Sequence, residues 1–119
     1  MTLGKMMNKK SFQKYINRDE GICCHCGTDD DTLVPQHRLG RGMGGSKERD
    51  VPSNIILICS RANGQLESNA TFAQMGRDFG WKLIQGQDPK KVPVWLADGW
   101  YLLDDEFGKK RVNPHIEAD

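Results

Sequence analysis

The sequence predicts an α+β fold built from short elements, and three observations carry this prediction. Phe12, Tyr15 and Ile16 fall at helical spacing within residues 9–17, which predicts a short amphipathic helix near the N-terminus. The run 55–58 (IILI) is rich in β-branched residues and is typical of a strand. The chain has 119 residues, of which 37% are hydrophobic, and this supports one domain with a modest core.

Two turn-rich segments and one further strand lie between these elements. Residues 20–27 are predicted to form a tight turn that carries cysteines. Residues 32–37 are predicted to form a strand, and Pro35 indicates a sheet edge or a bulge. Residues 39–53 hold four glycines and no hydrophobic periodicity, so we expect a long loop of the kind that is often functional or mobile.

The chain after residue 59 is predicted to form one helix and then several strands. The helix is expected at 63–79, ending at Gly80, with Leu66, Ala70, Ala73 and Phe72 on its buried side. Strands are expected at 81–84, 92–96 and 100–103, with a hairpin turn at Asp98-Gly99.

All three tryptophans lie in these predicted strands, where core packing is favoured over a DNA-stacking surface. From Phe107 onward the chain is expected to fray. A single domain therefore spans 1–119, with a core at about 22–79 and C-terminal strands at about 81–105.

Composition and charge narrow the classes of function. No apolar run approaches the roughly 20 residues that span a bilayer, so no membrane partner is expected. The N-terminal residues lack the apolar segment of a signal peptide, which favours the cytoplasm. The formal net charge of +1 argues neither for nor against nucleic acid. The distribution of the charge is more informative, because four basic residues gather between positions 38 and 49 beside a single acid. These are Arg38, Arg41, Lys47 and Arg49. Such a cluster suits a loop that contacts phosphate, although a solvated loop is the commoner outcome.

The four cysteines indicate a metal before a disulfide. Cys23 and Cys24 are adjacent, and Cys23 and Cys26 form a C-x-x-C, which in a cytoplasmic chain points to thiolate ligation. Gly27 follows directly and can take the positive φ that such a turn needs.

Three polar residues could together support phosphodiester hydrolysis. Histidine ordinarily titrates near neutral pH, so His37 suits a general base, provided that a fixed acceptor holds its other ring nitrogen. Asn54 is placed to hold loop and strand together so that a backbone carbonyl can be that acceptor. Asn63 offers an oxygen to a hard divalent cation. Each residue also has a plainer interpretation, namely a structural histidine, a turn-closing asparagine and a helix cap, and it is the combination that favours a site.

These positions resemble the HNH endonuclease family, and most closely its small phage proteins of the type found in actinobacterial phages. The resemblance rests on Gln36-His37-Arg38, the loop GMGGS at 42–46, the run PSNIILIC at 52–59 and Asn63-Gly64, with the upstream C-x-x-C in register. It covers about 22–79 and, less distinctively, the C-terminal segment. It implies a ββα-metal (His-Me finger) core of two strands and a helix around one divalent cation, with a short N-terminal helix and a small C-terminal β extension.

The resemblance also implies roles for individual residues. His37 matches the general base, and Asn54 matches the asparagine that fixes the loop and positions that base. Asn63 and Gln36 match positions that bind the catalytic ion, where the family more often has histidine or a carboxylate. Two amide oxygens would favour Mg²⁺ or Mn²⁺ over Ni²⁺ or Zn²⁺, although the latter two could serve. Residues implied to contact DNA phosphates are Arg38 and Arg41, with Lys47, Arg49 and Arg61 as weaker candidates.

A structural zinc is a separate question. Many HNH proteins have a second C-x-x-C after the strand, whereas this chain has Cys59-Ser60-Arg61-Ala62. Three interpretations stay open. Cys23, Cys26 and Cys59 could hold zinc with an outside ligand, the zinc could have been lost, or the cysteines could act as buried apolar residues.

The function predicted from the sequence is a divalent-metal-dependent DNA endonuclease that nicks with low sequence specificity. It would act in the cytoplasm, which for a phage-encoded protein is that of the host. One alternative is a weakened HNH-fold protein that binds DNA or assists phage packaging proteins, and another is a zinc-ribbon-like module that binds a protein partner. A single site cuts one strand, so a homodimer would be needed to cleave both.

Overall fold

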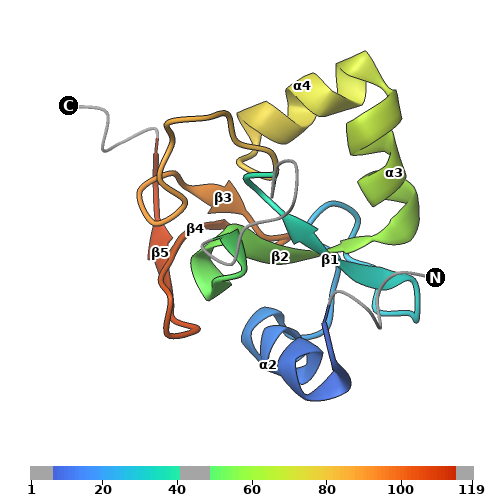
Figure 1. Ribbon diagram of the computed structural model, residues 1–119, viewed down its shortest axis with the longest axis vertical. Helices are drawn as coiled ribbons and strands as arrows, with labels where there is room; N and C mark the ends of the chain where they lie inside the picture. Colours follow the sequence, from blue (N-terminus) through green and yellow to red (C-terminus); the bar gives the residue numbers. More distant parts are fainter. Residues whose placement is uncertain (1–6, 41–48, 115–119) are drawn as a thin grey trace.

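The computed structural model describes residues 7–40 and 49–114, which form an α+β fold (Figure 1). A two-stranded sheet lies at the centre, between a helix on one side and a pair of helices and a second, three-stranded sheet on the others. The elements among the described residues are α2 (Lys9–Asp19), β1 (Leu33–His37), the 3₁₀ turn η2 (Pro52–Asn54), β2 (Ile55–Cys59), α3 (Ser60–Ser68), α4 (Ala70–Asp78), β3 (Val94–Trp95), β4 (Trp100–Leu103) and β5 (Lys109–Val112).

The central sheet pairs β1 with β2 in antiparallel register, from Leu33 opposite Cys59 to His37 opposite Ile55. Every residue of β2 is buried, as its unbroken apolar sequence predicts. Pro35 lies within β1 and is tolerated because β1 has a partner on one side only. Helix α3 begins directly after β2, so the strand fixes where the helix starts.

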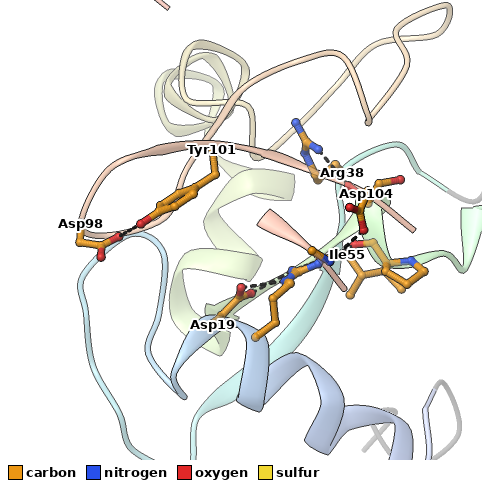
Figure 2. A network of polar contacts seen from close by, with 10 residues as sticks. Asp19, Arg38, Ile55, Asp98, Tyr101 and Asp104 are labelled. Carbon is orange, nitrogen blue, oxygen red and sulfur yellow. Dashed lines mark hydrogen bonds and ion pairs between the residues drawn. The ribbon is translucent and has the colours of Figure 1, made fainter. Parts of the chain in front are cut away.

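Helix α2 packs against β2 and is tied to it by a buried arginine. It confirms the predicted N-terminal helix and runs two residues beyond the expected end. Its Arg18 donates to the Asp19 carboxylate at 2.8 and 2.9 Å and to the carbonyl of Ile55 at 2.6 Å. The bond from Arg18 to the Ile55 carbonyl joins the helix to the start of β2 (Figure 2, where Asp19 and Ile55 are labelled).

The single helix predicted for 63–79 is wrong, because two helices occupy this segment. Helix α3 begins earlier, at Ser60, and Asn69 separates it from α4. Asn69 has an extended conformation (φ −124°, ψ 116°), and its side chain accepts from the Phe72 amide at 2.9 Å. Asparagine competes well for such capping positions, so it ends one helix and starts the next. The break also leaves Ala70 exposed, whereas Leu66 is buried as expected.

The C-terminal segment is partly as predicted. The hairpin at Asp98-Gly99 and the strand 100–103 are confirmed, and 92–96 is reduced to the short β3. No strand forms at 81–84. Fraying from Phe107 is wrong, because β5 pairs with β4 along its whole length. The β5 sequence KKRV has almost no apolar pattern, so it is recruited by the free edge of β4.

One hydrophobic cluster joins the central sheet, α3 and the C-terminal hairpin. Trp81 is buried and donates to the Trp95 carbonyl at 2.8 Å, which supports core packing for this tryptophan. The Tyr101 hydroxyl contacts Asp98 at 3.2 Å and closes the hairpin (Figure 2). Among the described residues, no helix is long and apolar enough to cross a membrane.

Candidate functional site

His37, the last residue of β1, is paired with the carboxylate of Asp50. Its Nε2 lies 2.7 Å from Asp50 Oδ1, and the imidazole is largely buried, with 11% of the side chain exposed. An ionised carboxylate only accepts, so Nε2 carries the proton in this contact. A neutral ring then has its lone pair on Nδ1, the nitrogen that can take a proton from water. The expected acceptor was a backbone carbonyl, and the carboxylate takes that place.

Asn54 holds the two ends of the loop that separates His37 from Asp50. Its Oδ1 accepts from the Leu39 amide at 2.8 Å, and its Nδ2 donates to the carbonyls of Leu39 at 3.1 Å and Arg49 at 2.9 Å. The side chain is buried and the backbone carbonyl of Asn54 also accepts from the amide of Arg38 at 2.8 Å. Asp50 follows Arg49 directly, so these bonds fix the backbone position from which the Asp50 side chain extends.

The two amides expected to hold a catalytic cation contact one another. Asn63 Nδ2 donates to Gln36 Oε1 at 2.5 Å, and Gln36 Nε2 donates to the carbonyl of His37 at 3.0 Å. Asn63 lies in the first turn of α3, and the cap of that helix is Cys59, so the plainer interpretation of Asn63 as an N-cap is wrong. The Asn63 Oδ1 is the amide oxygen not used in this pair. The set fits a weakly held, hard cation, because it supplies neutral oxygens and no charge.

Arg38 does not fit the role of a phosphate contact. Its residue is 1% exposed, and its guanidinium donates to backbone carbonyls only. Burial lowers the pKa of Arg38, and the charge of Arg18 adds to this effect. The carbonyls replace water around the buried charge and tie the site to the C-terminal segment; they belong to Ser53, Gly80, Pro89 and Val92, at 2.7–2.9 Å.

The other basic candidates differ in their availability. Arg61 is exposed in the first turn of α3. Arg49 donates to the Gly40 carbonyl and to Gln85 Oε1, so its guanidinium bridges the loop to the C-terminal segment. Arg41 and Lys47 lie outside the described residues.

A second site is formed by the cysteines. Cys23 and Cys26 come from the tight turn and Cys59 from the end of β2, and their Sγ atoms lie within 4.8 Å of one another. Gly27 has φ +77°, as the turn was predicted to need. Three thiol groups on a tight turn and a strand end are the donor set of a thiophilic ion. The residues therefore fit a metal ion.

The thiols of the cluster differ in how readily they ionise, because burial and the neighbouring cysteines raise the pKa of Cys59 whereas the surroundings of Cys23 favour its thiolate. The pKa of Cys23 is lowered to about 4, chiefly by a hydrogen bond from the Cys24 thiol and also by backbone N–H groups, against the effect of burial. Those N–H groups belong to His25, Cys26 and Cys59, at 3.2–3.5 Å from Cys23 Sγ. Burial raises the pKa of Cys24, which lies outside the cluster.

The sequence interpretation missed Asp50. It is the last acid before Pro52, and the pattern alone gives no sign of pairing, because 13 positions separate it from His37. A search for carboxylates at the far end of the glycine loop would have found it. Comparisons of the chain with family models, curated proteins and solved structures find no match.

Proposed function

We propose that the protein is a divalent-metal-dependent endonuclease of the HNH type, with β1, β2 and α3 as a ββα-metal core. The observation that carries the proposal is the contact of 2.7 Å between His37 Nε2 and Asp50. A carboxylate acceptor at Nε2 favours the tautomer that leaves Nδ1 unprotonated, and this histidine stands at the end of a strand, beside residues that Asn54 holds in place.

The chain's own residues would divide the work between base and support. His37 Nδ1 takes a proton from a water molecule as that water attacks the phosphorus, and the carboxylate of Asp50 stabilises the charged ring that results. Asn54 keeps Leu39 and Arg49 in place, so that the histidine and its carboxylate stay aligned. Among the basic candidates that the structure describes, Arg38 and Arg49 donate to backbone carbonyls. Arg61 is exposed and is therefore the better candidate for a phosphate contact.

A hard cation would be held through Asn63 and Gln36. When bound, Mg²⁺ or Mn²⁺ supplies positive charge to the phosphate and to the leaving oxygen. Because Gln36 Oε1 accepts from Asn63 in this structure, one of its two lone pairs is already used before an ion binds. We therefore expect weak binding of the ion to the protein alone, and firmer binding once DNA phosphate adds its own oxygens. Tight binding measured by calorimetry without DNA would contradict this expectation.

A second function is favoured by the same amide pair. Asn63 donates directly to Gln36, as expected for an HNH fold that binds DNA or a packaging partner and has lost its chemistry. In such a protein the pair is a structural hydrogen bond within the core. The two functions differ in what they require of His37, since only the enzyme depends on it.

Nicking of supercoiled plasmid separates the two functions. Wild-type protein is assayed with Mg²⁺, Mn²⁺, Ni²⁺ and Zn²⁺ beside His37→Ala, and beside His25→Ala as a matched histidine outside the site. We expect nicking with Mg²⁺ or Mn²⁺ that His37→Ala abolishes and His25→Ala retains. If the wild type cleaves with none of the ions but still binds DNA, the binding function is favoured. Equal activity of wild type and His37→Ala would reveal a contaminating nuclease.

A further inference from the structure

The cysteine cluster opens on one side into a groove. Cys23 is fully buried, whereas Cys26 is exposed, and Cys26 and Cys59 both line a groove of about 360 Å³. An ion in contact with all three sulfur atoms would be covered by protein on the Cys23 side. Its other side would face the groove.

The part of the chain that the structure describes gives this cluster three sulfur ligands and no fourth cysteine, histidine or carboxylate. Ala62 stands where a second C-x-x-C would place its last cysteine, three positions after Cys59. The Ala62 amide donates to Cys59 Sγ at 3.5 Å, so the backbone here already has the conformation of a turn that wraps around a cysteine sulfur. A thiophilic ion prefers four ligands, and three thiolates leave one position open.

Neighbouring groups that carry ligand atoms are engaged elsewhere. The His25 ring packs edge-on against Phe72 and Trp81, with centroids 5.1 and 5.5 Å apart. The Asp30 carboxylate lines the groove but accepts from the amide and hydroxyl of Thr32, at 3.0 and 2.6 Å. Neither residue lies close enough to all three sulfur atoms to join the cluster.

We propose that Cys23, Cys26 and Cys59 bind a zinc-type divalent ion and that its fourth position takes an exchangeable thiolate from a small molecule in the groove. Sulfur is the ligand that such a three-thiolate ion prefers. Arg61, on the rim of the groove, supplies positive charge near the incoming anion. The incoming thiol gives its proton to solvent, and its sulfur replaces a water molecule, so the exchange needs no oxidant or reductant.

Cobalt substitution of the full chain makes the ligand set visible, because sulfur-to-cobalt charge-transfer absorption grows with each thiolate. We expect about one Co²⁺ per chain. Adding 2-mercaptoethanol should then raise the charge-transfer absorption and shift the visible bands, reversibly on removal of the thiol. Ala62→Cys should show the stronger spectrum without added thiol and should not respond to it.

Two variants at the groove control for unspecific binding. Cys26→Ser should lose most of the charge-transfer absorption, whereas Ser60→Ala, which lines the same groove beside Cys59 without supplying sulfur, should keep it. An unchanged spectrum on addition of thiol would overturn the proposal, as would the absence of Co²⁺ binding. Half an ion per chain with concentration-dependent dimerisation would also overturn it, because a second copy would then supply the thiolate. If Ala62→Cys does not fold, the thiol titration of the wild type decides alone.

Discussion

Asn54 and Leu39 are joined by two hydrogen bonds, in which the side-chain amide of Asn54 pairs with both backbone polar groups of Leu39. The asparagine thus takes the place of a neighbouring strand at the point where β1 ends. Its third bond, to the carbonyl of Arg49, brings the far end of the glycine loop to the same residue. The loop is therefore closed by one buried side chain.

Replacing Asn54 by alanine should destabilise the protein strongly. The change leaves the amide and carbonyl of Leu39 and the carbonyl of Arg49 without this partner, and unsatisfied buried groups cost about 1–3 kcal/mol each. We expect a loss of about 2–4 kcal/mol in the free energy of unfolding, measured with urea. Asn17→Ala, on the exposed face of α2, is the control and should change it by less than about 0.5 kcal/mol. Equal effects would show that Asn54 does not close the loop.

Arg38→Met should also destabilise the fold, and this effect should not depend on the presence of DNA. The guanidinium of Arg38 donates to carbonyls of η2, of Gly80 and of the loop before β3, and methionine leaves all of them unpaired. We expect a loss of about 3–5 kcal/mol in chemical denaturation. Arg77→Met, at an exposed position of α4, is the matched control. If Arg38→Met weakens DNA binding and leaves stability unchanged, the phosphate contact implied by the sequence is right after all.

Asp50→Asn tests the carboxylate that the sequence did not reveal. An asparagine oxygen can still accept from His37 Nε2, but it cannot stabilise the charged ring. On the proposed function we expect a fall in kcat of about 10–100-fold with little change in KM. Asp78→Asn, which removes an exposed acid of α4, should have no such effect. A fall confined to KM would instead assign Asp50 to DNA binding.

Tyr15→Phe should change how stability depends on alkaline pH. Burial raises the pKa of Tyr15 to about 12, so the unfolded chain releases this proton near pH 10 while the folded protein keeps it. Between these values the unfolded state binds fewer protons, and stability falls as pH rises. The wild type should lose stability relative to Tyr15→Phe from pH 10 upward, on the order of 2 kcal/mol by pH 12. Parallel stability curves would show that the phenol is freely solvated.

Local patterns predicted the elements that depend on nearby residues. The β2 run, the turn at Gly27 and the Asp98-Gly99 hairpin each carry their own signal, and all three are present. Strand β5 and the break at Asn69 depend on the edge of β4 and on a cap, which periodicity does not record.

In the site, the sequence identified His37, Asn54 and the three clustered cysteines as residues of interest. It could not reveal that Arg38 is buried, because charged residues are seldom placed inside a core. Pairing of Asp50 with His37 across a 13-residue separation likewise depends on the folded chain and leaves no local sequence signal.

Single-turnover cleavage of a short DNA duplex in Mn²⁺, by wild type and His37→Ala, tests most directly whether His37 takes a proton from water. We expect the variant to retain its fold and its affinity for DNA and to cleave about 10²–10⁴-fold more slowly. Equal cleavage rates, measured on protein whose far-ultraviolet circular dichroism and DNA affinity match the wild type, would contradict the role of His37 as the general base.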